Sequence, residues 1–466
     1  MAYWRSIGCV AIVTTLASWT GSAHASTNFV EEVQAALYAG KTAEAAVVAG
    51  DRLAKAPDDD QARFALGAVQ FLQAIEHLGQ SLHQYGLRSS YQDPTGLAGL
   101  PILRIPVPHN PNPDKLTYEA FRAVLQRFAD DLAAADTTLA GISGGAVDLP
   151  LNIGLVRLDL DGDGASSDDE ALWLIFKTVA EARWLDEREA GKLLVDFDES
   201  DVPWLRAYIH LLMAVVEFPL AHDWRDAFQA TFHGVFPGAG LPLRVLFEEE
   251  MKALAELQEK GEGPKPPAKL PAESWPEYQI RYQAWLETPE GQERQRLDSL
   301  TNRATFGGIA DLVAFVHLNH WPVIEPERMQ RVLENLEAMI QFSRENWRRI
   351  KDETDDRNEW IPNTAQSGVL PRMRVTEERI AGWMQFLDEF EALLQGNKLL
   401  PHWRFDRGIN MRRMFLEPTT FDIVLLIQGS AAVPYLEEGE LTTGQTWRQI
   451  TRVFGGDFFR YFIWFN

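Results

Sequence analysis

The sequence predicts a mainly α-helical fold built from many helices. Apolar residues recur every three to four positions through most of the long segments, as they do on one face of an α-helix. Two proline-rich stretches interrupt these segments and mark loops, because proline fixes φ and lacks an amide donor. The composition, with 46% hydrophobic residues, 33 Gly and 25 Pro, is that of an ordinary globular protein.

Length and charge narrow the classes of function. A chain of 466 residues suggests two or three domains. Its 44 basic and 67 acidic side chains give a net charge of −23, which repels nucleic-acid phosphates and anionic membrane surfaces. We therefore expect no nucleic-acid partner.

The first 25 residues have the pattern of a secretory signal peptide. Arg5 precedes an uncharged apolar stretch over 7–19, and a small-residue site ends at Ala25. A spanning helix needs about 20 apolar residues, so this stretch is too short, and no later segment is expected to insert stably in a membrane. Cleavage after Ala25 removes the sole cysteine, Cys9, and with it thiol catalysis, disulfides and thiolate metal sites. The predicted location is periplasmic or secreted.

Residues 26–92 form the first predicted unit, with three Ala-rich helical runs between 28 and 86. Small and turn-forming residues punctuate these runs at Gly40, Ala45, Pro57 and Leu66-Gly67. In these positions the segment resembles about one and a half tetratricopeptide repeats, although Arg52 stands where the family has alanine. The resemblance implies a surface for a protein or peptide partner; a plain helical hairpin is the alternative.

The second predicted unit, 93–260, is a larger helical domain. Its first part, 93–114, contains six prolines and is expected to form an extended loop or lid. Helical spacing then predicts helices over 116–139, 170–194, 202–216 and 244–260. The proline-rich segment 261–276 is predicted to be a linker.

The third predicted unit, 277–466, is helical and rich in aromatic residues. The spacing predicts helices over 278–318, 327–349 and 376–394. Two short apolar runs, 421–427 and 458–465, fit buried strands or buried helical turns equally well, because periodicity does not separate these two structures.

An acidic loop over 159–170 carries the sharpest chemical signal. Calcium requires six to eight oxygen ligands, which a short loop supplies by alternating carboxylates, a sharp turn at glycine and a closing glutamate. Gly164 provides the turn, and the candidate oxygen ligands are the side chains of Asp159, Asp161 and Asp163, the Ala165 carbonyl, a water held by Ser167, and bidentate Glu170. The predicted cofactor is Ca²⁺.

This spacing resembles the EF-hand loop, with two departures. Ser166 occupies the eighth position, where the family has the aliphatic residue that pairs two loops, and the sequence has no second loop. The incoming segment 149–158 alternates like a strand and contains Pro150 and Gly154. We therefore expect one strand-loop-helix site that holds a structural ion. The alternative is an acidic turn that caps a helix beginning near Asp168.

Histidines offer a weaker metal hypothesis. His317 and His320 are one helical turn apart, and His210, Glu217 and His222 lie on or beside another apolar helix. A histidine on an apolar face is more often a hydrogen-bonded core residue, so the sequence favours the structural interpretation.

The sequence favours binding or scaffolding over catalysis. It has no phosphate-binding glycine loop or HExxH helix, and the GxSxG spacing at 141–145 follows a predicted helix instead of the strand that a nucleophile turn requires. The alternative is an envelope hydrolase acting on saccharides, with its cleft under the loop at 93–114. Its acid and base would come from Asp388, Glu389 and Glu391, and its sugar-stacking rings from Trp383 and Trp403.

Overall fold

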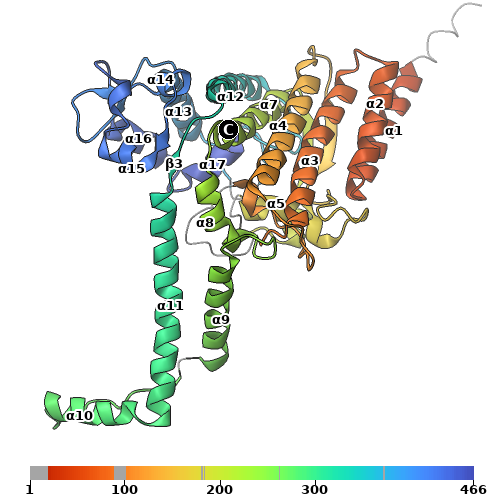
Figure 1. Ribbon diagram of the computed structural model, residues 1–466. Helices are drawn as coiled ribbons and strands as arrows, with labels where there is room; N and C mark the ends of the chain where they lie inside the picture. Colours follow the sequence, from red (N-terminus) through yellow and green to blue (C-terminus); the bar gives the residue numbers. More distant parts are fainter. Residues whose placement is uncertain (1–18, 89–100, 180–181, 183, 262, 371–372) are drawn as a thin grey trace, which may run out of the picture.

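A computed structural model describes residues 19–88, 101–179, 182, 184–261, 263–370 and 373–466. The fold is mainly α-helical, as the sequence predicts, with a helical body and one long projecting arm (Figure 1). Most of the signal-peptide prediction lies outside the described residues, and helix α1 begins at Trp19. Residues 93–100 of the predicted proline-rich loop also lie outside them, whereas 101–104 form a short 3₁₀ helix, η2 (Pro101–Arg104).

Four antiparallel helices form the N-terminal side of the body (Figure 1). They are α1 (Trp19–Tyr38), α2 (Thr42–Lys55), α3 (Asp60–Gln84) and α4 (Tyr118–Ala140). Gly40 makes the turn between the first two at φ +69°, a conformation that favours glycine. Arg52, the departure from the repeat pattern, pairs with Asp59 at 2.6 Å and covers the ring of Phe29.

Helix α7 (Asp201–Ala221) runs through the middle of the body between α4 and α12 (Pro326–Asp352). By length and composition alone it could cross a membrane, which corrects the expectation that no later segment is apolar enough. However, half of its apolar window is buried, and Arg206 on this helix pairs with Asp136 of α4 at 2.7 Å. Core helices of soluble proteins commonly meet the same test, so the composition of α7 is weak evidence for insertion.

The helix predicted over 170–194 is wrong in its length. A 3₁₀ turn η3 (Asp168–Glu170), helix α5 (Leu172–Val179) and the one-turn helix α6 (Glu187–Ala190) occupy this segment. Asp186 starts α6 by accepting the amide of Glu189, and Gly191 ends it. Strand β2 (Leu194–Asp198) then pairs antiparallel with β1 (Asp148–Asn152), with Leu151 opposite Val195. The strand-like segment predicted over 149–158 is confirmed only in its first part, because β1 ends at Asn152 and the chain turns over 153–155.

The arm consists of α9 (Arg244–Lys260) and α11 (Pro289–His317), with α10 (Trp275–Leu286) across its far end (Figure 1). Leu297 and Leu300 of α11 pack with Ala253 of α9 between the two long helices. The single helix predicted over 278–318 is therefore wrong: Thr288 caps a new helix through its hydroxyl, and the chain turns there. The segment predicted as a linker, 261–276, joins α9 to α10 at the end of the arm.

The C-terminal part packs on α12 and contains α13 (Glu377–Leu394), α14 (Met411–Leu416), α15 (Ile423–Gln428), α16 (Gly444–Arg452) and α17 (Phe458–Phe465). The two ambiguous apolar runs are thus mainly helical. The short strands β3 (His320–Trp321) and β6 (Phe421–Asp422) pair with each other. A small sheet is formed by β4 (Leu400–Pro401), β5 (Gly408–Ile409) and β7 (Leu436–Glu437), beside the 3₁₀ turn η4 (Val433–Tyr435).

Two large apolar clusters make up the core. The first joins α1 to α4, β1, α7 and α8 (Arg225–Val235). The second joins α12, α13, α16 and α17, and Trp383 and Phe465 are completely buried in it. The strand β1 and the acidic loop lie against the first cluster, because Leu158 and Leu160 insert their side chains there.

Candidate metal centre

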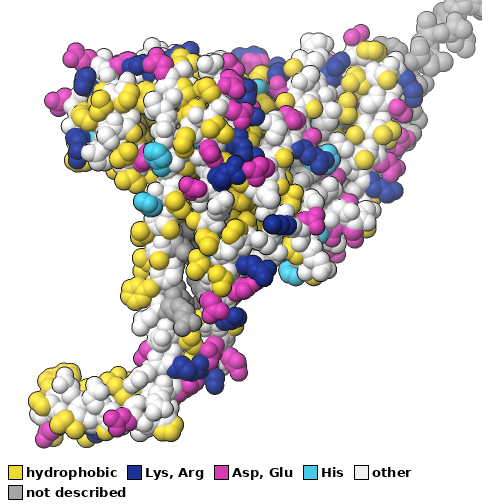
Figure 2. Space-filling model, viewed as in Figure 1, with side chains coloured by type: hydrophobic (Ala, Val, Ile, Leu, Met, Phe, Trp, Pro, Cys, Tyr) yellow, Lys and Arg dark blue, Asp and Glu magenta, His cyan; other side chains and the backbone are white. Residues whose placement is uncertain are grey.

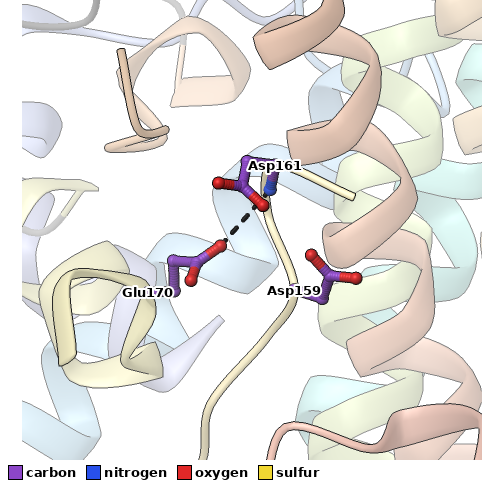
Figure 3. Close-up of side chains that lie close together, drawn as sticks. All are labelled: Asp159, Asp161 and Glu170. Carbon is purple, nitrogen blue, oxygen red and sulfur yellow. Dashed lines mark hydrogen bonds between the residues drawn. The ribbon is translucent and has the colours of Figure 1, made fainter. Parts of the chain in front are cut away.

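Three carboxylates of the acidic loop converge on one point. Asp159, Asp161 and Glu170 each offer an oxygen, and these oxygens lie within 4.8 Å of one another (Figure 3). Glu170 is only 2% exposed, whereas the two aspartates are half-buried. Such an arrangement of hard oxygens from three side chains has the chemistry of a divalent-cation site.

Glycine conformation and backbone amides shape the loop. Gly162 and Gly164 have φ values of +75° and +86°, which favour glycine. The Asp159 carboxylate accepts the amide of Gly162 at 2.8 Å and that of Gly164 at 3.1 Å. The chain therefore turns around Asp159, as a calcium loop requires at its first ligand position.

Glu170 closes the loop from its other end. One of its oxygens accepts the amides of Leu160 and Asp161 at 2.8 and 3.3 Å, and the other accepts the amide of Ser167 at 2.7 Å. The η3 turn places this side chain under the loop rather than in solvent (Figure 3). Glu170 consequently orders the loop even before any ligand is considered.

Helix α3 holds the loop in place through two side chains. Glu76 accepts the amide of Asp159 at 2.9 Å and the hydroxyl of Thr42 at 2.6 Å, while Gln80 donates to the Asp159 carbonyl at 2.9 Å. Burial raises the pKa of Glu76. Neither anchor is predictable from local spacing, because both lie about eighty positions before the loop; the only local signal is a glutamate on an apolar helical face.

The remaining predicted ligands are not part of this group. The Asp163 carboxylate accepts the amide of Ala165 at 2.8 Å and does not join the three-carboxylate cluster. Ala165 is exposed, and Ser167 uses its amide to bind Glu170. Burial raises the pKa of Asp161, and the neighbouring charges of Glu170 and Asp163 act in the same direction. A bound cation would oppose this shift by favouring the charged carboxylate.

A second acidic group was not anticipated from the sequence. Asp198 at the end of β2, Glu353 after α12 and Glu359 have carboxylate oxygens within 4.8 Å of one another. The buried Asp201 carboxylate accepts the amide of Asp198 at 3.0 Å beside them. These residues are up to 161 positions apart, counting from 198 to 359, so no local spacing reveals the group.

Protonation is favoured in this second group. Burial raises the pKa of Glu359 to about 7, and the charges of Glu353 and Asp198 add to the effect. Burial and the charge of Asp198 also hold the pKa of Asp201 well above its usual range. In the absence of a cation, the folded state therefore binds protons here that the unfolded chain releases.

We expect Glu359→Gln to stabilise the metal-free protein at pH 8. With a folded pKa near 7 and an unfolded value near 4.5, the stabilising contribution of Glu359 is fully present below pH 4.5 and is lost as the pH rises through 7. The substitution should raise the midpoint of thermal unfolding at pH 8 by about 2 °C. The midpoint of the variant should also fall less between pH 5 and 8 than that of the wild type. Thermal unfolding in a chelating buffer measures both effects.

Glu345→Gln is the matched control. The guanidinium of Arg348, with that of Arg349, lowers the pKa of Glu345 to about 2, so its contribution is present above pH 4.5 and is lost as the pH falls toward 2. This variant should lose stability at pH 8. If both variants change the unfolding midpoint at pH 8 in the same direction, the pKa of Glu359 is not raised in the folded protein.

The histidine hypothesis receives no support from the described residues. His210 bonds to Asn335 at 2.7 Å, His222 to the Phe218 carbonyl at 2.7 Å, and His320 to Asp422 at 2.8 Å. Glu217 is paired with Arg328 and Arg331 at 2.9 and 3.0 Å. Neither of the two potential metal-binding groups found there contains a histidine, and His317 ends α11.

The residues proposed for a hydrolase do not converge. Asp388 and Glu391 share Arg344, each at 2.8 Å, whereas Glu389 is buried against Lys398 at 2.6 Å. Trp383 is 0% exposed and Trp403 is 73% exposed, so the two rings do not line one surface. The carboxylates are thus used in ion pairs, which does not support an acid-base pair.

No protein-family model, curated protein or solved structure matches this chain. The tetratricopeptide-like pattern and the EF-hand-like pattern therefore stay predictions. Their support within the chain is the helical hairpin α1–α2 followed by α3, and the three converging carboxylates of the loop.

Proposed function

We propose that the protein is an exported calcium-binding protein, in which one structural Ca²⁺ orders the loop 159–170. The observation that carries this proposal is the convergence of Asp159, Asp161 and Glu170, with oxygens within 4.8 Å of one another (Figure 3). The export part rests on the signal-peptide pattern before Ser26. Extracytoplasmic calcium modules bind with Kd values of about 10⁻⁴ to 10⁻³ M, a range suited to that location.

The ligand chemistry favours calcium over other metals. All candidate groups are oxygens, which suits Ca²⁺ and Mg²⁺ better than copper or zinc. Mg²⁺ demands a small octahedral site and retains its waters, whereas a twelve-residue loop with alternating carboxylates provides the larger shell of Ca²⁺. The loop is fastened to α3 by Glu76 and Gln80, which supports a structural ion rather than a switch.

We expect Asp161→Asn to remove calcium-dependent stabilisation. Asparagine keeps the oxygen that accepts the Asp163 amide at 3.1 Å, so the loop can fold, but it removes the charge that attracts the cation. In the wild-type protein, saturating calcium should raise the unfolding midpoint by about 2 to 5 °C, because the ion binds only the native state. Thermal unfolding after chelation, with calcium or magnesium added back, measures this shift.

Asp169→Asn is the control for this experiment. Asp169 lies in the same loop and carries the same charge, but it is exposed and outside the three-carboxylate group. It should retain the calcium shift. If calcium at 10 mM gives no shift, or if magnesium gives the same one, the loop is an acidic cap on η3 and not a calcium site.

The second part of the proposed function is binding of a protein or peptide partner, and the arm is the surface that supports it. Helix α11 presents Phe306, Ile309, Val313 and Val316 at helical spacing, and all four are exposed. Figure 2 shows hydrophobic side chains along the side of the arm that faces away from α9 and at its far end, where α10 lies. An apolar stripe on a projecting helix is typical of a contact surface for another chain.

A photo-crosslinking amino acid at position 313 tests this surface in cells that produce the protein. Val313 is 62% exposed on α11, and Val47 on α2 is equally exposed at 62%, so position 47 is the matched control. We expect a discrete crosslinked protein at 313 that is absent at 47. Identical or absent adducts at both positions would remove the arm as the partner surface, and the calcium experiment would be unaffected.

A further inference from the structure

An apolar cavity of about 200 Å³ lies in the body, and no carboxylate of either acidic group lines it. It is partly open, and its lining comes from α3, α5, α7 and α17, from the paired strands β1 and β2 with the residues beside them, and from Trp360. Protein interiors are normally packed to the density of organic crystals, so a void of this size is unusual. An apolar cavity of about 150 Å³ is large enough to bind benzene.

Helix α5 has the composition of a helix that contacts an apolar ligand. Its sequence is Leu-Trp-Leu-Ile-Phe-Lys-Thr-Val, yet Ile175 is its only fully buried residue. Trp173 and Phe176 line the cavity and are partly exposed, so the side chains of the described residues do not cover them completely. The driving force to cover such surface is the hydrophobic effect.

The lining specifies an uncharged and aromatic occupant. It contains no Asp, Glu, Lys, Arg or His, so a charged ligand would be buried there without a partner, at a large cost in free energy. Rings from several elements, including Phe64, Phe197 and Trp204, surround the space. Aromatic side chains prefer offset or edge-to-face contacts with another ring.

Tyr208 provides the single hydroxyl of the lining. Its ring stacks on Trp204 with the centroids 5.8 Å apart, and it meets Phe71 edge-on. No hydrogen bond to this hydroxyl is found among the described residues, and burial raises the pKa of Tyr208 to about 12. A neutral hydroxyl that has no partner among the described residues can bond a hydroxyl of a ligand.

We infer that this cavity is a binding site for a neutral single-ring aromatic compound, with a hydroxyl group that bonds Tyr208. The volume allows one ring with small substituents, the absence of charge excludes carboxylates, and the tyrosine selects phenols over alkylbenzenes. No candidate calcium ligand and no residue of the arm lines this site.

Isothermal titration of the full chain with p-cresol, toluene and benzoate tests the inference. We expect saturable one-site binding of p-cresol, weaker binding of toluene and none of benzoate. Ala68→Leu projects a larger side chain from α3 into the cavity and should weaken p-cresol binding at least tenfold. Ala133→Leu adds the same atoms on the exposed face of α4 and should leave binding unchanged.

Two further variants keep the test decisive. Ile463→Phe fills the cavity from α17, so it replaces Ala68→Leu if that variant does not fold, as judged by its far-ultraviolet circular dichroism. Tyr208→Phe should weaken p-cresol several-fold and leave toluene unchanged. Absence of saturable p-cresol binding to the wild-type protein, or binding that both cavity-filling variants retain, would overturn the inference.

Discussion

Arg122→Met is expected to lower the free energy of unfolding by about 3 kcal/mol. Arg122 of α4 donates to the carbonyls of Leu220 and His222 at 2.7 and 2.9 Å and to Glu325 at 2.8 Å. These carbonyls belong to the C-terminal end of α7, where no further helical amide is present to bond them. Methionine preserves much of the apolar volume but removes all three of these donor contacts; Glu325 then keeps only Arg328, and the His222 carbonyl only the more distant Tyr118 hydroxyl. Urea denaturation at pH 7 measures the loss.

Arg225→Met is the control for Arg122. Arg225 also carries a guanidinium near the start of a helix, but it is exposed and pairs with the exposed Glu119. Exposed pairs contribute little, because solvent screens them and the side chains lose conformational freedom. The urea midpoint of this variant should stay close to that of the wild type. A similar loss in both variants would show that the Arg122 contacts contribute no more than a surface ion pair.

Gly154→Ala is expected to destabilise the protein by about 2 to 4 kcal/mol and to disturb the pairing of β1 with β2. A Cβ atom on Gly154 would lie 1.9 Å from the backbone oxygen of Ala190 and 2.5 Å from its carbonyl carbon. Both atoms belong to the main chain of α6 and cannot move away as the end of a flexible side chain can. The acidic loop lies in the chain between β1 and β2, and both strands line the cavity. The proposed calcium and p-cresol binding should therefore weaken as well.

Gly50→Ala separates this clash from a general effect of glycine replacement. Gly50 lies within α2, and nothing is found within 4 Å of a Cβ placed there. Alanine should stabilise this helix by about 0.5 to 1 kcal/mol, because it restricts the unfolded backbone. The urea midpoint of unfolding should therefore rise for Gly50→Ala and fall for Gly154→Ala. If Gly154→Ala leaves the free energy of unfolding unchanged, α6 can shift away from Gly154 at little cost.

The acidic loop, the paired strands β1 and β2, and the cavity form one connected region. The loop begins seven residues after β1 ends, counting from Asn152 to Asp159, and α5 starts two residues after Glu170. Residues of β1 and α5 line the cavity directly. Order imposed on the loop by the proposed ion would therefore extend to the walls of the cavity.

The sequence alone was sufficient for features that depend on neighbouring residues. Helices α3 and α4 begin where Asp59 and Thr117 accept amides of the first turn, and such caps are local. The loop 159–170 was recognisable for the same reason, since its candidate ligands fall within twelve consecutive residues. Periodicity was also sufficient for the helical class, because it reports which face of each segment is apolar.

Only the tertiary structure decided the features that need distant partners. The segment after α5 leaves the helical pattern because β1 offers a strand for Val195 and Phe197 to pair with. Glu359 acquires its raised pKa from burial beside Asp198 and Glu353, which the chain brings together from remote positions. The cavity likewise exists only where six parts of the fold fail to fill the space between them. Local patterning determines which face of an element is apolar, whereas packing between elements decides what that face meets and what space it leaves open.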